Sequence, residues 1–134
     1  MGFTLIPRAL VFEAHRRTLA EHGGAQGIRN EGLIDSALSK PANLIAYGSP
    51  ARHDLAASYA FGLARNHGFV DGNKRVAAVV SSAFVLLNGT RLDVTQREFE
   101  RIFVAVAAGE MTEQDLAAWF ERNCVSEDAG RPRT

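Results

Sequence analysis

This sequence of 134 residues has one cysteine, no net formal charge and no long apolar run. A single cysteine, Cys124, cannot form an intramolecular disulfide, so a small secreted domain built on disulfides is excluded and the reducing cytoplasm is expected. The 15 basic residues are balanced by 15 acidic ones, whereas a protein that grips duplex nucleic acid is usually basic. We therefore expect no direct contact with nucleic acid.

The chain also lacks the features of a membrane or secreted protein. Its most apolar stretch, residues 76–87, is about 12 residues long and contains two serines, whereas a membrane-spanning helix needs roughly 20. Residues 1–7 lack the charged and apolar regions of a secretory signal. The length suits one compact domain, which we expect over residues 1–125, followed by a flexible tail over residues 126–134.

Apolar residues recur at helical spacing and are interrupted by glycine and proline, which predicts an all-α bundle of about six helices. The expected helices are residues 7–22, 31–40, 51–67, 74–88, 95–109 and a last one from residue 112. Pro41 is expected to end the second helix, and Cys124 to lie on the last. Residues 91–94 are expected to form a short extended link. The fourth helix is apolar nearly all round, which predicts a place at the centre of the bundle.

The chemistry is concentrated in residues 67–75, which read HGFVDGNKR. Gly72 allows the backbone to turn and to approach a ligand closely. The helix that follows presents free N–H groups at its start, where partial positive charge gathers. Lys74 and Arg75 add two full positive charges, and an arginine can clamp phosphate oxygens with two hydrogen bonds. This loop therefore predicts a site for phosphate groups.

Three further residues of the same stretch extend the hypothesis. Asp71 would repel a bare phosphate, so we expect it to bind Mg²⁺, which typically takes one or two carboxylates together with phosphate oxygens. Asn73 offers an amide to phosphate or metal. His67 is the natural general base, because an imidazole near neutral pH can accept a hydroxyl proton.

Simpler interpretations of these residues remain open. A histidine at a helix end is often only a structural hydrogen bonder, and Asp-Gly-Asn is often only a turn. Two cations in a first helical turn oppose the helix macrodipole unless an anion is bound, so the residues alone favour neither interpretation. Outside the motif, His15 lies on an apolar stripe and is expected to be a core histidine, and residues 23–27 contain no P-loop pattern.

The string HGFVDGNKR resembles the core motif of the Fic/Doc superfamily, and specifically its Doc branch. Members that transfer AMP usually carry H-P-F-x-x-G-N-G-R, and Lys74 in place of the second glycine is the Doc variation. Gly68 stands where many members have proline, which we expect to loosen the loop. The resemblance continues on both sides of the motif, in His15-Arg16-Arg17, Gly23-Gly24, Gly27-Ile28-Arg29, Gly32-Leu33, Ser36-Ala37-Leu38, Pro41 and Leu87-Asn88-Gly89.

The resemblance implies an all-helical Fic fold and a toxin with protein kinase activity. Doc toxins are understood to transfer the γ-phosphoryl group of ATP to a threonine of elongation factor Tu. Carried over to this chain, His67 would be the base and Asp71 would hold Mg²⁺. The residues that would bind the phosphates of ATP are Arg65, Gly72, Asn73, Lys74 and Arg75.

Two other functions are kept as alternatives: an AMP-transferring Fic enzyme, against which Lys74 argues, and a largely non-catalytic co-repressor that binds its antitoxin. Many Fic enzymes carry an inhibitory helix with Glu four residues after Ser or Thr. No serine or threonine of this chain has that partner. We therefore expect a separate antitoxin, a partly disordered segment that folds into a groove of the bundle.

Overall fold

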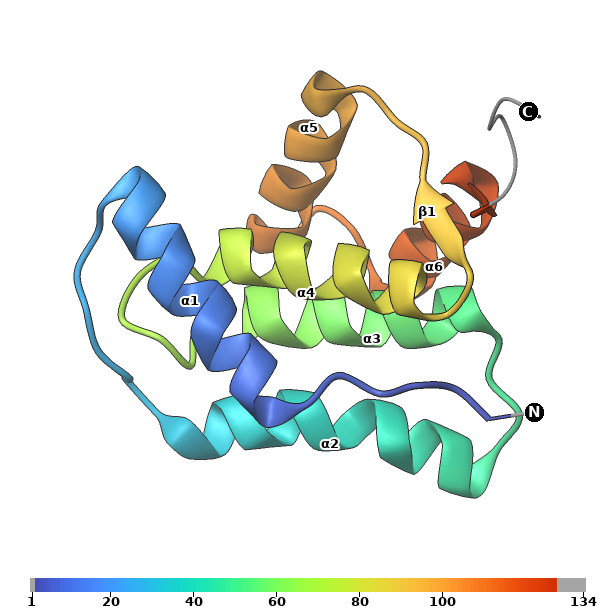
Figure 1. Cartoon of the computed structure of the whole chain (residues 1–134), viewed down its shortest axis with the longest axis horizontal. Coiled ribbons are helices and arrows are strands. Elements are labelled where there is room, and N and C mark those ends of the chain that lie inside the picture. Colours follow the sequence, from blue (N-terminus) through green and yellow to red (C-terminus); the bar gives the residue numbers. More distant parts are fainter. Residues whose placement is uncertain (1, 128–134) are drawn as a thin grey trace, which may run out of the picture.

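The computed structural model describes residues 2–127, and within them the chain folds into six helices and one small sheet (Figure 1). The elements are α1 (Arg8–His22), α2 (Glu31–Tyr47), α3 (Arg52–Arg65), α4 (Asn73–Leu87), β1 (Thr90–Leu92), α5 (Gln96–Ala107), α6 (Glu113–Asn123) and β2 (Cys124–Ser126). The predicted all-α bundle of about six helices is confirmed. Among the helices described, none has both the length and the hydropathy to cross a membrane.

The centre of the bundle is the pair α3 and α4, which run side by side (Figure 1). Ala56, Ala57 and Ala60 of α3 are fully buried, and their small side chains allow the neighbouring helices to approach closely. The prediction that α4 is surrounded by the bundle is only partly right. Val79 and Leu86 on its outer face remain about half exposed, at 47% and 53%, so α4 presents an apolar surface to solvent.

The predicted end of the second helix at Pro41 is wrong, because α2 continues through this proline to Tyr47. A proline inside a helix removes one backbone hydrogen bond and usually kinks or breaks the helix. Here the proline ring is buried, and Lys40 beside it forms an ion pair with Glu113 at the start of α6. Tertiary packing therefore offsets the local preference.

The extended link predicted over residues 91–94 is confirmed in part, since Thr90–Leu92 form strand β1, which pairs with β2 in antiparallel register, Thr90 opposite Ser126 and Leu92 opposite Cys124. Cys124 therefore lies on a strand and not on the last helix, and burial raises the pKa of its thiol. The predicted tail begins too early, since Ser126 is paired and the Glu127 N–H donates to the Gly89 carbonyl at 3.0 Å. The rest of the predicted tail, residues 128–134, lies outside the described residues.

The segment before α1 is fastened to the central helices by three hydrogen bonds. The Asn88 side chain, at the end of α4, accepts from the Thr4 N–H at 2.8 Å and donates to the Thr4 carbonyl at 2.9 Å. The Ile6 N–H donates to the Tyr59 hydroxyl at 3.0 Å. These bonds set where α1 begins, and α1 then crosses α4 near the start of that helix (Figure 1).

Candidate active site

The motif loop, residues 66–72, connects α3 to α4. The helix was predicted to include His67, but α3 ends at Arg65 and His67 has a φ of +52°. This left-handed conformation is uncommon for a residue other than glycine and persists only where surrounding contacts impose it. One such contact is the Asn66 side chain, which donates to the Leu33 carbonyl of α2 at 3.1 Å. The His67 ring is exposed and has no hydrogen-bond partner among residues 2–127.

A second loop, residues 23–30 between α1 and α2, pairs with the motif loop in the manner of two strands. The Gly68 carbonyl accepts from the N–H groups of Arg29 and Asn30 at 2.8 and 2.9 Å. The Val70 N–H donates to the Gly27 carbonyl at 3.1 Å. These bonds hold the motif loop to a segment about forty residues earlier in the chain.

Gly68 is packed closely against α2, a contact that the expectation of a looser loop did not include. A Cβ atom at this position would lie 2.3 Å from Cγ1 of Ile34 and 3.2 Å from its backbone nitrogen. Both distances are shorter than ordinary van der Waals contact. The glycine is therefore required by the close approach of α2, and Ile34 is a partner that the sequence alone did not reveal.

The Asn73 side chain closes the motif loop on itself. Its Oδ1 accepts from the Phe69 N–H at 3.0 Å, and its Nδ2 donates to the Phe69 carbonyl at 2.9 Å. Each end of the amide therefore makes one hydrogen bond to Phe69, and the predicted contact with phosphate or metal stays a prediction. Asn73 can still offer its backbone N–H to an anion.

The start of α4 has the properties of an anion site. Gly72 precedes it with a φ of +82°, a conformation that favours glycine, and no side chain caps the helix. The first turn contains no acidic residue. Lys74 and Arg75 are exposed and form no ion pair within the described part of the chain. Free N–H groups and two unpaired cations therefore converge at one helix end.

Asp71 lies at the edge of this region with its carboxylate exposed. Its Oδ1 accepts from the Gly72 N–H at 2.9 Å, and its Oδ2 accepts from the Ala25 N–H at 3.3 Å. Over residues 2–127 no cluster of three or more histidine, cysteine or acidic side chains is placed to hold a metal. Any metal here would therefore take Asp71 as its protein ligand and complete its coordination from a substrate and water.

Beside Lys74 and Arg75 the surface opens into a hollow of about 430 Å³ between α1, α4 and α5. Apolar side chains form much of its wall, and polar side chains of α1 and α5 also line it. The lining residues are Thr18, Glu21, His22, Lys74, Arg75, Ala78, Val79, Gln96, Phe99, Glu100, Phe103 and Val104. A hollow with an apolar wall and a basic end suits a ligand with an organic body and a phosphate group.

Arg65 is not brought into this hollow. Its guanidinium lies against the end of α5, where Nη1 donates to the Val106 carbonyl over a long 3.4 Å, close to Gly109. A phosphate role for Arg65 would require this side chain to turn, and it stays a prediction.

The face of α1 that carries Phe12 and His15 packs against the motif loop. The sequence indicated this support only in part. Phe12 meets the buried Phe69 edge to face at 5.6 Å, and the His15 ring stacks on Phe69 at 3.8 Å. Nε2 of His15 lies 2.9 Å from the Asp71 carbonyl oxygen. The prediction of a core position for His15 is confirmed by its 8% exposure. The helical spacing of Phe12 and His15 was the available signal, but it did not identify what they contact.

Residues 5–85, which include the whole motif, match the Fic/DOC family. Because the match covers more than half of the chain, this protein belongs to the Fic/DOC family, and the predicted membership is confirmed. The chain is also similar to Toxin Doc of Mycolicibacterium smegmatis, with 41% identity over 73 residues. The similarity covers 52% of this chain and 55% of that protein, so it spans about half the length of the relative.

We predict that Gly68→Ala lowers the free energy of unfolding by roughly 1–3 kcal/mol, because the new Cβ overlaps Ile34 in a packed site. Urea unfolding followed by circular dichroism measures the change. Gly48→Ala is the control, since its Cβ would be 3.4 Å from the nearest atom, an ordinary contact, and should change stability by less than about 0.5 kcal/mol.

The clash also predicts a coupling between the two positions. In an Ile34→Ala background the cost of Gly68→Ala should fall substantially, because the closest atom, Cγ1, is gone and only the 3.2 Å approach to the backbone nitrogen remains. An equal cost in both backgrounds would show that Ile34 is not the reason for the glycine.

Proposed function

We propose that this chain is the toxin of a toxin–antitoxin pair and a protein kinase that transfers the γ-phosphoryl group of ATP to a threonine of elongation factor Tu. The observation that carries the proposal is the uncapped start of α4, where Lys74 and Arg75 have no acidic partner in the described residues. His67 and Asp71 lie on the loop that leads into this helix. The similarity to a relative named Toxin Doc supports the same proposal.

In this proposal the phosphates of ATP lie at the free N–H groups of the first turn of α4, and Lys74 and Arg75 neutralise their charge. His67 accepts the proton of the threonine hydroxyl as its oxygen bonds to the γ-phosphorus. The bond between the γ-phosphorus and its bridging oxygen breaks, and ADP leaves. Phosphoryl transfer depends mostly on positioning and charge neutralisation, which are the two contributions that these residues can make.

Asp71 fits the role of a Mg²⁺ ligand in this reaction. Its carboxylate is exposed, and the bond from Ala25 to Oδ2 is long at 3.3 Å, so that oxygen can exchange its partner at little cost. When bound, the ion would neutralise charge on the phosphates. Asp71 would hold it at the edge of the basic region, opposite the cations.

The presence of Lys74 is an argument for transfer of the γ-phosphoryl group and against transfer of AMP. It stands at the second residue of α4, where AMP-transferring members of the family carry a glycine that leaves the site open. A lysine side chain here occupies space and adds a charge close to the free N–H groups. ATP would then be bound with its γ-phosphate toward His67.

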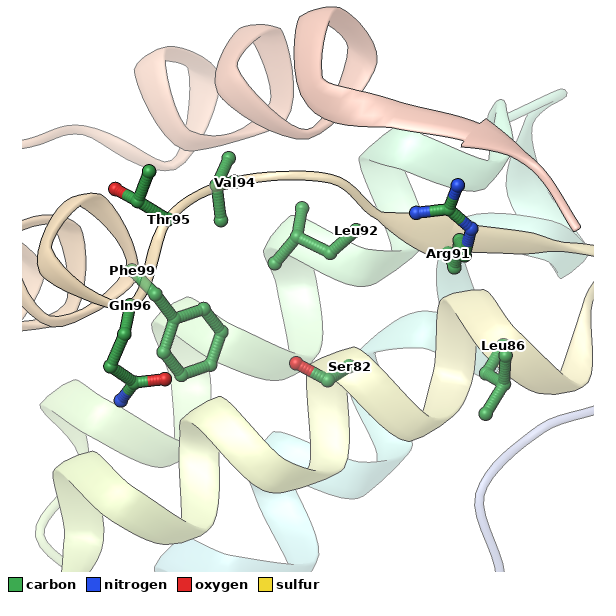
Figure 2. A pocket seen from close by; sticks show the side chains of 8 residues that line it. All are labelled: Ser82, Leu86, Arg91, Leu92, Val94, Thr95, Gln96 and Phe99. Atoms are coloured by element: carbon green, nitrogen blue, oxygen red, sulfur yellow. The ribbon is translucent and has the colours of Figure 1, made fainter. Parts of the chain in front are cut away.

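An apolar groove along α4 supports the proposed antitoxin partner. A second hollow lies between the later half of α4, β1 and the start of α5, and Figure 2 shows Leu92 above Ser82 of α4 and the Phe99 ring beside it. It shares Gln96 and Phe99 with the hollow beside Lys74. We call the two together the α4–α5 groove. Its lining includes Lys74, Arg75, Val79, Ser82, Leu86, Leu92, Val94, Gln96, Phe99 and Val104, together with the acidic Glu21 and Glu100.

The groove suits a segment that folds on binding. An amphipathic helix would cover the exposed apolar side chains of α4, and an acidic side chain on it would meet Lys74 and Arg75 and exclude ATP. Such a segment could be removed by proteolysis when free, which would release the toxin.

The central experiment incubates the protein with purified elongation factor Tu and ATP labelled at either the α or the γ position. We expect label from the γ position only, and His67→Ala should reduce transfer by roughly 10²–10⁴-fold, the usual contribution of a general base. The His67→Ala variant should keep its circular dichroism spectrum, since the ring is exposed. Label from the α position would instead identify an AMP-transferring enzyme, and transfer at the wild-type rate by His67→Ala would exclude this base.

Asp71→Ala should weaken binding of ATP in Mg²⁺ much more than binding of ATP in a chelator, because its proposed partner is the cation. Isothermal calorimetry under the two conditions measures the difference. Asp93→Ala, an exposed acidic residue far along the chain, serves as the control. Equal losses with and without Mg²⁺ would contradict a metal role for Asp71.

Leu86→Arg should prevent neutralisation by the product of the neighbouring open reading frame, because burying an unpaired charge would weaken binding roughly tenfold or more. Growth after co-expression and calorimetry with the purified partner are the measurements. Ile45→Arg on α2, an exposed apolar residue outside the groove, should remain neutralised. If the partner protects cells from the Leu86→Arg variant as well as from the wild type, the partner binds outside the α4–α5 groove.

A further inference from the structure

His15 makes a directional contact with the motif loop across 56 residues of sequence. Nε2 lies 2.9 Å from the Asp71 carbonyl oxygen, and a carbonyl oxygen can only accept a hydrogen bond. Nε2 therefore carries the hydrogen and donates it. The ring is fixed at the same time, because it stacks on Phe69 with 14° between the two planes.

The bond acts on the peptide group that links Asp71 to Gly72. The carbonyl of this peptide accepts from His15, and its N–H donates to Oδ1 of Asp71 at 2.9 Å. Because a peptide group is planar, fixing its carbonyl also fixes the direction of its N–H. The Asp71 carboxylate is therefore held at Oδ1 through the peptide that His15 fixes, and at Oδ2 by the weaker bond from the Ala25 N–H.

Apart from the 3.3 Å contact of Oδ2 of Asp71 with the Ala25 N–H, the hydrogen bonds that tie the motif loop to other segments fall on its earlier part. Gly68 and Val70 pair with the loop before α2, and Phe69 is bonded to Asn73. For the Asp71–Gly72 peptide, the structure of residues 2–127 shows the bond to His15 as its tie to another element. The His15 ring packs close to Gly72 without crowding it, since a Cβ atom at Gly72 would lie 3.6 Å from Cδ2 of His15, an ordinary contact.

We propose that His15 is a positioning residue, which acts through the Asp71–Gly72 peptide to hold the Asp71 carboxylate and the start of α4 in the arrangement that binds substrate. The structural part of this inference stands on the geometry alone. Its catalytic part rests on the proposed kinase function. If His15 only filled space in the core, the packing of its ring on Phe69 would suffice and the hydrogen bond from Nε2 would not matter.

Two substitutions separate the hydrogen bond from the packing. His15→Phe keeps a flat ring on Phe69 but removes the donor, whereas His15→Gln keeps an N–H donor at a similar reach. We expect His15→Phe to speed amide exchange at Gly72 roughly fivefold or more, the change that loss of a typical hydrogen bond allows. Transfer from ATP to elongation factor Tu should show kcat reduced roughly 10- to 100-fold, as for other supporting residues. His15→Gln should recover most of both effects.

Exchange is measured by NMR on the protein without nucleotide, so it does not depend on the reaction. Val11→Ala, a buried position on the same helix, is the control for lost stability and should leave exchange at Gly72 close to the wild-type value. Unchanged exchange and kcat in His15→Phe would overturn the proposal. So would a His15→Gln variant as impaired as His15→Phe, or a Val11→Ala variant with the same fast exchange. If the wild type transfers no phosphate, the kinase function fails, and the exchange comparison alone decides the role of His15.

Discussion

The site depends on the burial of one aromatic side chain, Phe69, in the middle of the motif loop. Its ring is 1% exposed and lies against Phe12 and His15 of α1, and burial of a side chain of this size contributes roughly 1.5–3 kcal/mol. Its backbone N–H and carbonyl are bonded to Asn73 at the start of α4. The same residue therefore joins the loop to the first helix on one side and to the fourth on the other. The exposed residues before and after it can be presented to a ligand because this central point is buried and hydrogen-bonded.

The fold was largely predictable because helix periods, glycine stops and threonine caps are local signals. Thr95 and Thr112 each cap a helix as the pattern indicates, accepting from Glu98 and Asp115. The errors have a tertiary origin. Pro41 remains inside α2 because it is buried in the bundle, and residues 124–126 form a strand because β1 offers a partner. No local window of sequence contains either partner.

For the site, the sequence identified the residues that carry charge but not the residues that hold them. His67, Asp71, Lys74 and Arg75 could be recognised by chemistry and by resemblance. Their grouping on one loop and helix start follows from their closeness in the chain. The supporting contacts from His15 and Ile34 join segments far apart in sequence, so neither could be inferred. Asn73 shows the same limit from the other direction, since nothing in the sequence indicates that both ends of its amide are bonded to Phe69 in the structure.

The long separations across the site have a consequence for the newly made chain. His15 meets Asp71 over 56 residues, and Ala25 meets the same residue over 46. Contacts of this kind close large loops and form only after both partners are available. A chain synthesised through α3 alone lacks the motif loop, and one that has just added α4 must still dock it on α1. The ribosome that makes this protein therefore completes most of the chain before the candidate site can form.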